Sequence, residues 1–361
     1  MFYSPFDQRS RDTESLMIAF RGQGHRVISL SQSTGDGIHD YVRGHGIETY
    51  SHVIPGAGSL RYYARHVLFL ISFVRKHKVQ IVYSHLEPAN VVASIAQYFV
   101  KAKVYIVRHH IDVAKLHGFD KSWAYRLTYR LAKTVIVVSP QAKKFMVESE
   151  HADARKIIHI NLAYDFSLYA KPAAHKVKSL RSGFEDAVTL LTVCRFTPYK
   201  RAQVSIEILK RLRDEGVNAR LFLLGRGEDE DKLRNIIREW KLDDRVHMPG
   251  HVTNVLDYMA ASDFLVHPSV SESSCVTVKE AALVHLPVIV CSGVGDFDDY
   301  IEAGKNGFAL PAREFTQQAT EIIVKQKDAD LSKMTTALYD TVIRLFSIDN
   351  VVGNYKKLNE A

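Results

Sequence analysis

Short apolar runs alternate along the chain with longer segments in which apolar residues recur every three or four positions. The short runs predict strands buried on both faces, and the longer segments predict amphipathic helices. In the first half, the predicted strands are residues 2–4, 27–31, 81–84, 104–108, 134–138 and 157–160. The pattern starts afresh at residue 187, with predicted strands at 188–193, 220–224, 264–267 and 287–290 and predicted helices at 203–215, 228–240 and 275–284.

This alternation of strands and helices predicts an α/β protein with parallel sheets covered by helices on both faces. Residues 171–186 are polar, basic and aperiodic, so we interpret them as a linker. It would join a domain of residues 1–170 to a domain of residues 187–345. In two doubly wound domains, the carboxyl ends of the strands form the usual place for a ligand.

Composition adds little to this picture but excludes some classes. The chain has 361 residues, of which 46% are hydrophobic and 24% charged, which is ordinary for a globular protein of about two domains. No apolar run approaches the ~20 residues of a membrane-spanning helix. The start of the chain has no long apolar core typical of a signal peptide, and the three cysteines show no metal-ligand spacing. We therefore expect a cytoplasmic protein.

Charge is distributed unevenly between the two halves. Residues 1–170 contain 22 Lys and Arg against 13 Asp and Glu, a net charge of +9, whereas the remainder has 26 against 27, a net charge of −1. A basic half predicts an anionic partner, such as an acidic substrate, an anionic membrane surface or nucleic acid. No nucleic-acid-binding motif accompanies the charge, so we expect no nucleic-acid partner.

The most informative segment runs from Glu272 to Glu280, two carboxylates separated by seven residues. It follows one predicted strand and continues into a predicted helix, so one acid lies at the start of the helix and the other about two turns along it. Carboxylates accept hydrogen bonds from sugar hydroxyls, and the free N–H groups at a helix start attract phosphate.

The segment resembles the E-x7-E signature of the retaining glycosyltransferases of the GT-B fold, family 4 (glycosyl transferases group 1). Other segments carry the same resemblance, in the order expected for the family: the G-H-x-V at 24–27, the Arg…Lys pair within 195–200, the glycine-rich turn at 224–227 and the G-x-N-G-F-like stretch at 304–308. The resemblance implies two Rossmann-like domains facing across a cleft, with a C-terminal helix at about 346–361 that packs back on the first domain.

The resemblance also implies roles for residues of the second domain. Arg195 and Lys200 would bind the diphosphate and stabilise it as it leaves, although Arg201 is an alternative to Lys200. Glu272 would lie near the donor sugar, and Glu280 would hold the nucleotide ribose. The backbone N–H groups of Ser274, Cys275 and Val276 would face the sugar and phosphate. The family usually has Phe-Gly at 274–275, and a cysteine in place of glycine predicts hindered approach of the donor.

In the first domain, the family has a histidine that touches the donor sugar, and either His109 or His110 matches its position. The usual Gly-Gly of the first loop is missing. Arg9 and Arg11 stand in that loop, and we expect them to bring charge to phosphate or acceptor.

Two further motifs are ambiguous. Gly225-Arg226-Gly227 is equally compatible with a simple turn and with donor binding, and it lacks the third glycine of a dinucleotide fingerprint. Asp296-Phe-Asp298 resembles a metal-binding D-x-D, but its place before a helical stretch favours helix capping. We therefore expect no metal and no obligatory cofactor.

The resulting hypothesis is an enzyme of class EC 2.4. It would transfer a sugar from a UDP- or GDP-sugar to a saccharide or lipid-linked hydroxyl in polysaccharide, lipopolysaccharide or glycolipid synthesis. The mixed basic and aromatic segments 60–78 and 121–133 predict peripheral association with the inner, anionic face of a membrane. The alternatives are a nucleotide-sugar epimerase or phosphorylase on the same scaffold, and a non-catalytic basic binding protein.

Overall fold

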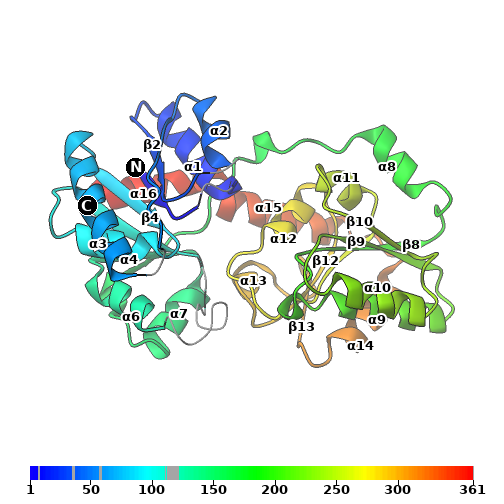
Figure 1. The fold of residues 1–361 in the computed structure, drawn as a ribbon. Coiled ribbons are helices and arrows are strands. Elements are labelled where there is room, and N and C mark those ends of the chain that lie inside the picture. Colours follow the sequence, from blue (N-terminus) through cyan, green and yellow to red (C-terminus); the bar gives the residue numbers. More distant parts are fainter. Residues whose placement is uncertain (7–8, 35–36, 57–58, 110, 112–121, 361) are drawn as a thin grey trace. The chain divides into compact units, whose positions relative to one another are not determined.

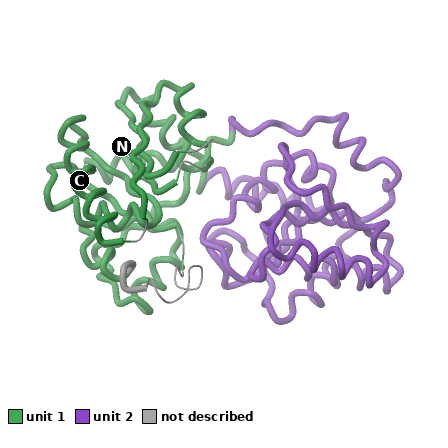
Figure 2. Tube along the Cα trace, viewed as in Figure 1, with its two compact units in different colours: residues 1–166, 345–361 green, residues 167–344 purple. Residues whose placement is uncertain are grey.

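The computed structural model describes residues 1–6, 9–34, 37–56, 59–109, 111 and 122–360, and they form two compact units (Figure 1). Unit 1 comprises Met1–Phe166 and Leu345–Ala361, and unit 2 comprises Ser167–Arg344 (Figure 2). Each unit is built around one parallel sheet.

Unit 1 contains a seven-stranded sheet in the order β3-β2-β1-β4-β5-β6-β7, with every neighbouring pair parallel. Its strands are β1 (Phe2–Ser4), β2 (Ile28–Ser31), β3 (Glu48–Ser51), β4 (Ile81–His85), β5 (Lys103–Arg108), β6 (Thr134–Val137) and β7 (Ile157–His159). Its helices are α1 (Arg11–Gly22), α2 (Ile38–Arg43), α3 (Leu60–Lys76), α4 (Ala89–Ala96), α6 (Ser122–Leu131), α7 (Pro140–Glu148), the short η2 (Ala154–Lys156) and α16 (Ile348–Glu360).

Alternating strand residues of unit 1 supply two cores, one on each face of the sheet. Tyr3, Leu30 and Ile106 pack with α3, α4, α6 and α7. Phe2 and Tyr83 pack on the other face with α1, α2 and α16. Both faces are therefore buried, which explains why the central strands are apolar at almost every position.

Unit 2 contains a six-stranded parallel sheet in the order β10-β9-β8-β11-β12-β13. Its strands are β8 (Val188–Val193), β9 (Ala219–Leu224), β10 (Val246–Gly250), β11 (Phe264–His267), β12 (Val288–Cys291) and β13 (Phe308–Leu310). Its helices are α8 (Ala174–Arg181), α9 (Ala202–Asp214), α10 (Glu230–Glu239), α11 (Val255–Ala260), α12 (Val276–Leu283), α13 (Phe297–Tyr300), α14 (Phe315–Gln326) and α15 (Ser332–Phe346), with short η3 (Phe166–Leu168) and η4 (Pro198–Lys200).

The stretch 171–186, which the sequence predicts to be an aperiodic linker, contains helix α8 and belongs to unit 2. None of the residues of α8 is buried, so the helix has no apolar periodicity for the sequence to reveal. Polar contacts attach it instead: Arg181 pairs with Asp263 at 2.6 Å, and the N–H of Ala173 donates to Asp257 at 2.7 Å.

The chain returns to unit 1 near its end. The N–H of Tyr164 donates to the carbonyl of Phe346, and the N–H of Ile348 donates to the carbonyl of Tyr164, both at 2.8 Å. Helix α16 then packs along the sheet, where the Tyr83 hydroxyl donates to Asn359 at 2.7 Å and the Tyr105 hydroxyl donates to the carbonyl of Leu358 at 3.0 Å. Unit 2 therefore begins after Phe166 and ends before Leu345.

Candidate active site

The strand order of unit 2 reverses direction between β8 and β11, which lie side by side at the centre of the sheet. Loops that leave the carboxyl ends of two such strands run to opposite sides and open a crevice where α/β proteins bind ligands. Lys200 lies in the loop after β8, and Glu272 lies in the loop after β11. The topology therefore brings together two residues that stand 72 positions apart in the sequence.

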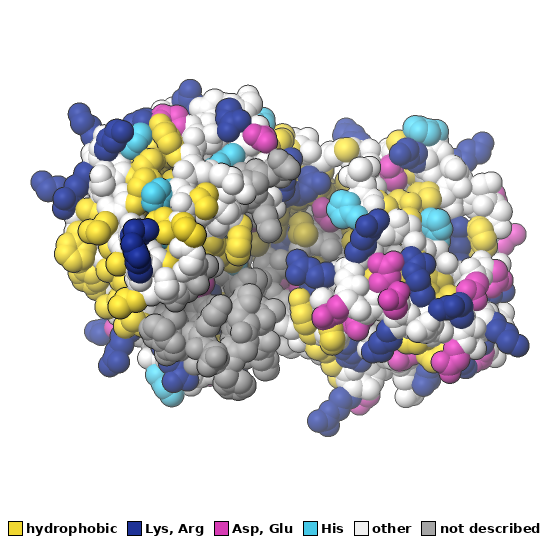
Figure 3. Space-filling view, viewed as in Figure 1, with side chains coloured by type: hydrophobic (Ala, Val, Ile, Leu, Met, Phe, Trp, Pro, Cys, Tyr) yellow, Lys and Arg dark blue, Asp and Glu magenta, His cyan; other side chains and the backbone are white. Residues whose placement is uncertain are grey.

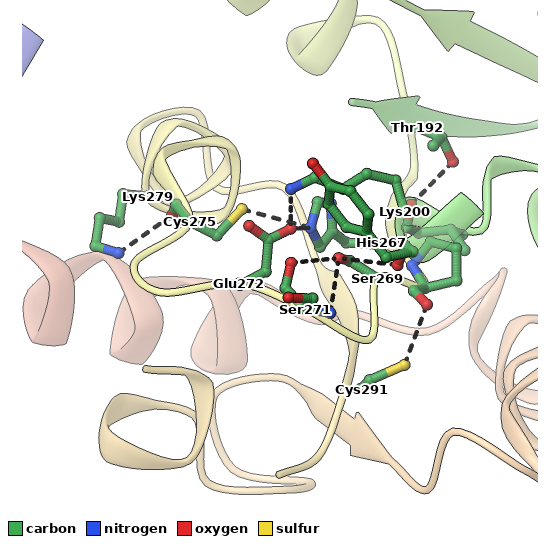
Figure 4. A network of polar contacts seen from close by, with 12 residues as sticks. Thr192, Lys200, His267, Ser269, Ser271, Glu272, Cys275, Lys279 and Cys291 are labelled. Atoms are coloured by element: carbon green, nitrogen blue, oxygen red, sulfur yellow. Dashed lines mark hydrogen bonds and ion pairs between the residues drawn. The ribbon is translucent and has the colours of Figure 1, made fainter. Parts of the chain in front are cut away.

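One carboxylate oxygen is the centre of this site (Figure 4). Oε1 of Glu272 accepts from Nζ of Lys200 at 2.5 Å and lies 2.7 Å from Nε2 of His267. Nε2 of His267 also lies 3.5 Å from Sγ of Cys275. The side chains of Lys200 and Glu272 are only 17% and 9% exposed, so this is a largely buried cluster of opposite charges.

Burial and charge act against each other in this cluster. Burial would raise the pKa of Glu272, but His267 and Lys200 hold it well below its ordinary value. Burial would lower the pKa of His267, but its contacts with Cys275 and Glu272 raise it. Burial likewise opposes the charge of Lys200, yet Glu272 raises the pKa of this ammonium group. The site therefore holds an ionised carboxylate against the ammonium group of Lys200.

The structure distinguishes Lys200 from Arg201, which the sequence leaves as alternatives. Arg201 donates through Nη1 to the carbonyl of Ala312 at 3.1 Å, away from Glu272. Arg195, at the end of β8, is exposed. Glu280 is buried in α12, only about one turn after its first residue, Val276, and not two turns along the helix as the sequence predicts.

A second, fully buried ion pair fixes the loop that carries Glu272. Nζ of Lys279 lies 2.8 Å from Oδ2 of Asp296, and the exposed fractions of the two side chains are 0% and 2%. The hydroxyl of Ser274 donates to the same oxygen at 2.6 Å, and Nζ of Lys279 also donates to the carbonyl of Cys275 at 3.1 Å. This pair connects the start of α12 to the loop before α13.

The sequence predicts that Asp296 caps a helix, and this prediction is wrong in its main point. Asp296 does occupy the N-cap position of α13, but its side chain makes no capping hydrogen bond. It accepts from Lys279 and Ser274 instead, because a buried ammonium group attracts a carboxylate more strongly than a backbone N–H does. Neither Lys279 nor its ion pair is recognisable from the local sequence.

The departure from the usual Phe-Gly at 274–275 has a structural explanation. Cys275 has a φ of −81°, a conformation open to any residue, and its thiol is buried against His267. The close approach belongs to another glycine: a Cβ on Gly295 would lie 2.8 Å from Cβ of Glu272, and Gly295 has a φ of +61°. The position that requires glycine lies in the loop after β12, outside the motif.

The glycines of Gly225-Arg226-Gly227 allow close contact between backbones. A Cβ on Gly225 would lie 1.8 Å from the carbonyl oxygen of Cys194, and one on Gly227 would lie 2.2 Å from that of Phe196. The loop after β9 is thereby pressed against the loop that carries Arg195. The Arg226 side chain is exposed and extends over Gly250.

In unit 1, the predicted site residues occupy the carboxyl ends of strands. Nε2 of His109, after β5, lies 2.8 Å from Nδ1 of His85 at the end of β4, and burial lowers the pKa of both imidazoles. His110 lies outside the described residues. Arg9 forms a two-bonded ion pair with Glu14, at 2.5 and 2.8 Å, and Arg11 is the exposed first residue of α1.

Glu87, two residues after β4, is a titratable residue that sequence reasoning did not single out. Its Oε2 accepts from the N–H of Val91 at 3.1 Å, whereas its Oε1 is buried without a hydrogen-bond partner in the described part of the chain. Burial raises the pKa of this carboxyl to about 8, although Val91 and the charge of Arg108 act in the opposite direction.

The raised pKa predicts a specific dependence of stability on pH. Because the folded chain binds this proton more tightly than the unfolded chain, the stabilisation is complete below the unfolded pKa and is lost as the pH rises through about 8. We expect Glu87→Gln, which cannot ionise, to gain stability relative to the parent between pH 5 and 9, by at most about 1.4 kcal/mol per pH unit. Urea unfolding at pH 5, 7 and 9 measures this. The exposed Glu148→Gln is the control, and a constant difference at all three pH values would contradict the prediction.

Two family models together match most of the chain. Residues 11–168 match Glycosyltransferase Family 4, and residues 178–335 match Glycosyl transferases group 1. The chain is a GT-B glycosyltransferase of family 4. The motif-based recognition, the two-sheet fold class and the assignment to EC 2.4 are thereby confirmed.

Individual relatives of this glycosyltransferase are distant. The N-acetyl-alpha-D-glucosaminyl L-malate synthase of Bacillus anthracis is 23% identical over 79% of this chain and 75% of its own length. A putative colanic acid biosynthesis glycosyltransferase of Escherichia coli is 24% identical over 70% of this chain and 63% of its own length. The structure of Anabaena HepE in complex with UDP superposes with a TM-score of 0.84 and 19% identity, covering 99% of this chain and 98% of that one.

One group of three side chains in the described residues has the chemistry of metal ligands. One ligand atom each from His267, Glu272 and Cys275 lies within 4.8 Å of the others. The positive charge that such a group would take from a metal is supplied here by Lys200, whose ammonium contacts the same carboxylate oxygen. The arrangement therefore already balances the charge of Glu272.

Proposed function

We propose that this glycosyltransferase moves a sugar from a nucleotide-diphosphate sugar to a hydroxyl acceptor, with retention of anomeric configuration and without a metal. The observation that carries the proposal is the contact between Lys200 and Glu272 at the switch point of the unit 2 sheet. When a nucleotide sugar binds, the ammonium group can turn to its diphosphate and the carboxylate can turn to its sugar hydroxyls.

The roles of the donor-binding residues follow from their chemistry. Lys200 and the exposed Arg195 would bind the diphosphate, and Glu272 would accept from sugar hydroxyls. Glu280 would accept from the ribose hydroxyls. Backbone N–H groups of 274–276 at the start of α12 would bind phosphate oxygens, since a helix N-terminus favours negative charge. Gly225 and Arg226 would border the same site.

The reaction would use no protein nucleophile. The bond between the anomeric carbon and the diphosphate oxygen breaks while the acceptor oxygen attacks from the same face. The acceptor proton passes to the departing diphosphate. Lys200 and Arg195 would stabilise the negative charge that grows on that group.

We assign acceptor binding to unit 1, where His109 or His110 would contact the transferred sugar and Arg9 or Arg11 would contact acceptor or phosphate. Arg9 would first have to leave Glu14. The UDP complex of HepE favours a UDP-sugar over a GDP-sugar. The colanic acid relative supports a role in polysaccharide biosynthesis. We propose a saccharide or lipid-linked acceptor at the cytoplasmic face of a membrane.

A product assay separates this function from its alternatives. We expect release of free nucleoside diphosphate that depends on an acceptor, after UDP-, GDP- and ADP-sugars have been ranked by thermal stabilisation of the chain. An epimerase would convert the donor without an acceptor, and a phosphorylase would require inorganic phosphate. Either result would replace the proposal.

Replacing Glu280 tests the donor site directly. We expect Glu280→Ala to weaken donor binding about ten- to a hundredfold, because a hydrogen bond to a charged group contributes about 1.5–3 kcal/mol. Glu280→Gln, which keeps the shape of the buried side chain, separates loss of binding from loss of folding. Calorimetry with the preferred donor measures the affinity of both Glu280 variants. The exposed Glu239→Ala on α10 is the control. Parental affinity in the folded Glu280 variants would remove Glu280 from the site.

A further inference from the structure

Helix α3 presents an exposed stripe that is apolar and basic at once. Leu60 is 87% exposed and Leu68 is 69% exposed, and Arg61, Arg65 and Arg75 occupy the same solvent-facing side of the helix. The opposite side of α3 is buried through residues such as Leu70 and Phe73. Because the buried side of α3 already packs on the core of unit 1, the exposed leucines do not contribute to that core.

The stripe continues beyond the helix. The guanidinium of Arg75 donates to the carbonyl of Phe99 at 2.8 Å, which attaches the end of α3 to the turn after α4. In this turn, Tyr98 is 55% and Phe99 is 56% exposed. Beside them, a surface groove of about 1050 Å³ is lined in part by Arg75, Lys78, Tyr98, Phe99, Lys101 and Lys103.

We define the α3 face as Leu60, Arg61, Arg65, Leu68, Arg75, Lys78, Tyr98, Phe99, Lys101 and Lys103. Its charge has one sign: residues 60–111 contain a single acid, Glu87. Apolar side chains of unit 1 gather between Lys and Arg side chains in Figure 3, whereas acidic and basic side chains alternate over unit 2.

We propose that the α3 face docks unit 1 on the surface of an anionic lipid bilayer. This inference rests on the proposed function, because it supplies the route to a lipid-linked acceptor. Leu60 and Leu68 would enter the boundary between headgroups and acyl chains, Tyr98 and Phe99 would lie at headgroup level, and the cations would pair with lipid phosphates.

A leaflet fits this surface better than an acidic protein does. A protein interface typically has a well-packed apolar core inside a polar rim, whereas the α3 face has scattered leucines, each with an arginine nearby. None of the helices in the described part of the chain is long and apolar enough to cross a bilayer. The amino end of α3 follows the carboxyl end of β3, so the stripe runs from the carboxyl ends of the strands, where His85 and His109 lie, towards their amino ends.

Vesicle sedimentation tests the proposal. The probes are vesicles of phosphatidylcholine alone and of phosphatidylcholine with increasing phosphatidylglycerol, each at low and high salt. We expect binding that increases with phosphatidylglycerol and decreases with salt. Arg61→Gln combined with Arg65→Gln should reduce partitioning about 25-fold, or about fivefold for each cation removed. Leu68→Ser should weaken the binding that remains at high salt.

The control is Lys232→Gln combined with Lys325→Gln, two exposed cations of unit 2, which should bind vesicles like the parent. Nucleoside diphosphate release with a soluble acceptor is measured in parallel and should be the same in all variants. Absence of vesicle binding, equal binding to neutral vesicles, or equal loss in the control variant would overturn the docking proposal. Such results would leave the proposed transfer reaction untouched, because it is read from the soluble-acceptor assay.

Discussion

Replacement of Lys200 by alanine is expected to reduce turnover about a hundred- to a thousandfold, while donor affinity changes much less. The reason is that negative charge on the diphosphate is greatest as the bond to the sugar breaks, so a nearby cation stabilises the transition state more than the bound donor. Removal of one preorganised group of this kind typically costs about 2.7–4 kcal/mol of transition-state stabilisation. Arg195→Ala is expected to act in the same direction, but less strongly, because Arg195 is exposed and solvent screens its charge.

The measurement is kcat at saturating donor together with the dissociation constant of the donor. Lys200→Ala also removes one partner of Glu272, so circular dichroism and thermal unfolding must first establish that the variant is folded. Lys210→Ala, on the surface of α9, removes an ammonium group from an exposed pair with Asp214 and is the matched control. Full turnover in both Lys200→Ala and Arg195→Ala would show that these cations do not act on the leaving group.

The second large effect concerns stability. We expect Lys279→Met to lower the free energy of unfolding by about 3–5 kcal/mol, the typical cost of leaving one member of a buried ion pair without its partner. Asp296 is 1% exposed, and the Ser274 hydroxyl alone would then have to satisfy its charge. Urea denaturation followed by fluorescence reports on this change, because Trp240 belongs to unit 2.

The double variant Lys279→Met, Asp296→Asn distinguishes an ion pair from simple packing. Removal of both charges should restore part of the stability, so the effects of the two single changes should not add. Additive losses would mean that each side chain acts through its own packing. Donor binding by the double variant, measured where it is folded, would then report how far the pair positions Glu272.

The stability effect and the turnover effect are linked through one loop. Lys279 and Asp296 hold the start of α12, and the preceding loop places Glu272 against Lys200 and His267. Gly295, next to Asp296, allows this loop to approach closely. The proposed donor site thus depends on residues after β12 for which no contact with the donor is predicted.

Sequence periodicity alone located most of the architecture. The central strands of both sheets are apolar because helices cover both faces, and the apolar runs therefore marked β8, β9, β11 and β12 to within a residue or two. Periodicity missed β3 and β10, because these strands at the sheet edges are partly exposed and have little apolar pattern. It also missed β13, which has only three residues. It missed α8 because a helix with no buried residue leaves no periodic signal.

In the candidate site, too, some features can be read from the local sequence and others exist only in the tertiary structure. Glu272, Glu280 and Lys200 stood out in the sequence because the short segments that carry them resemble family motifs, and such motifs are local. The pairing of Lys200 with Glu272 and His267, the ion pair of Lys279 with Asp296, and the need for glycine at 295 were not. Such contacts exist only after parallel strands are placed in the order β8, β11, β12, which brings the loops at their carboxyl ends together. The sequence determined which side chains stand at the ends of strands, and the tertiary structure decided which of them meet.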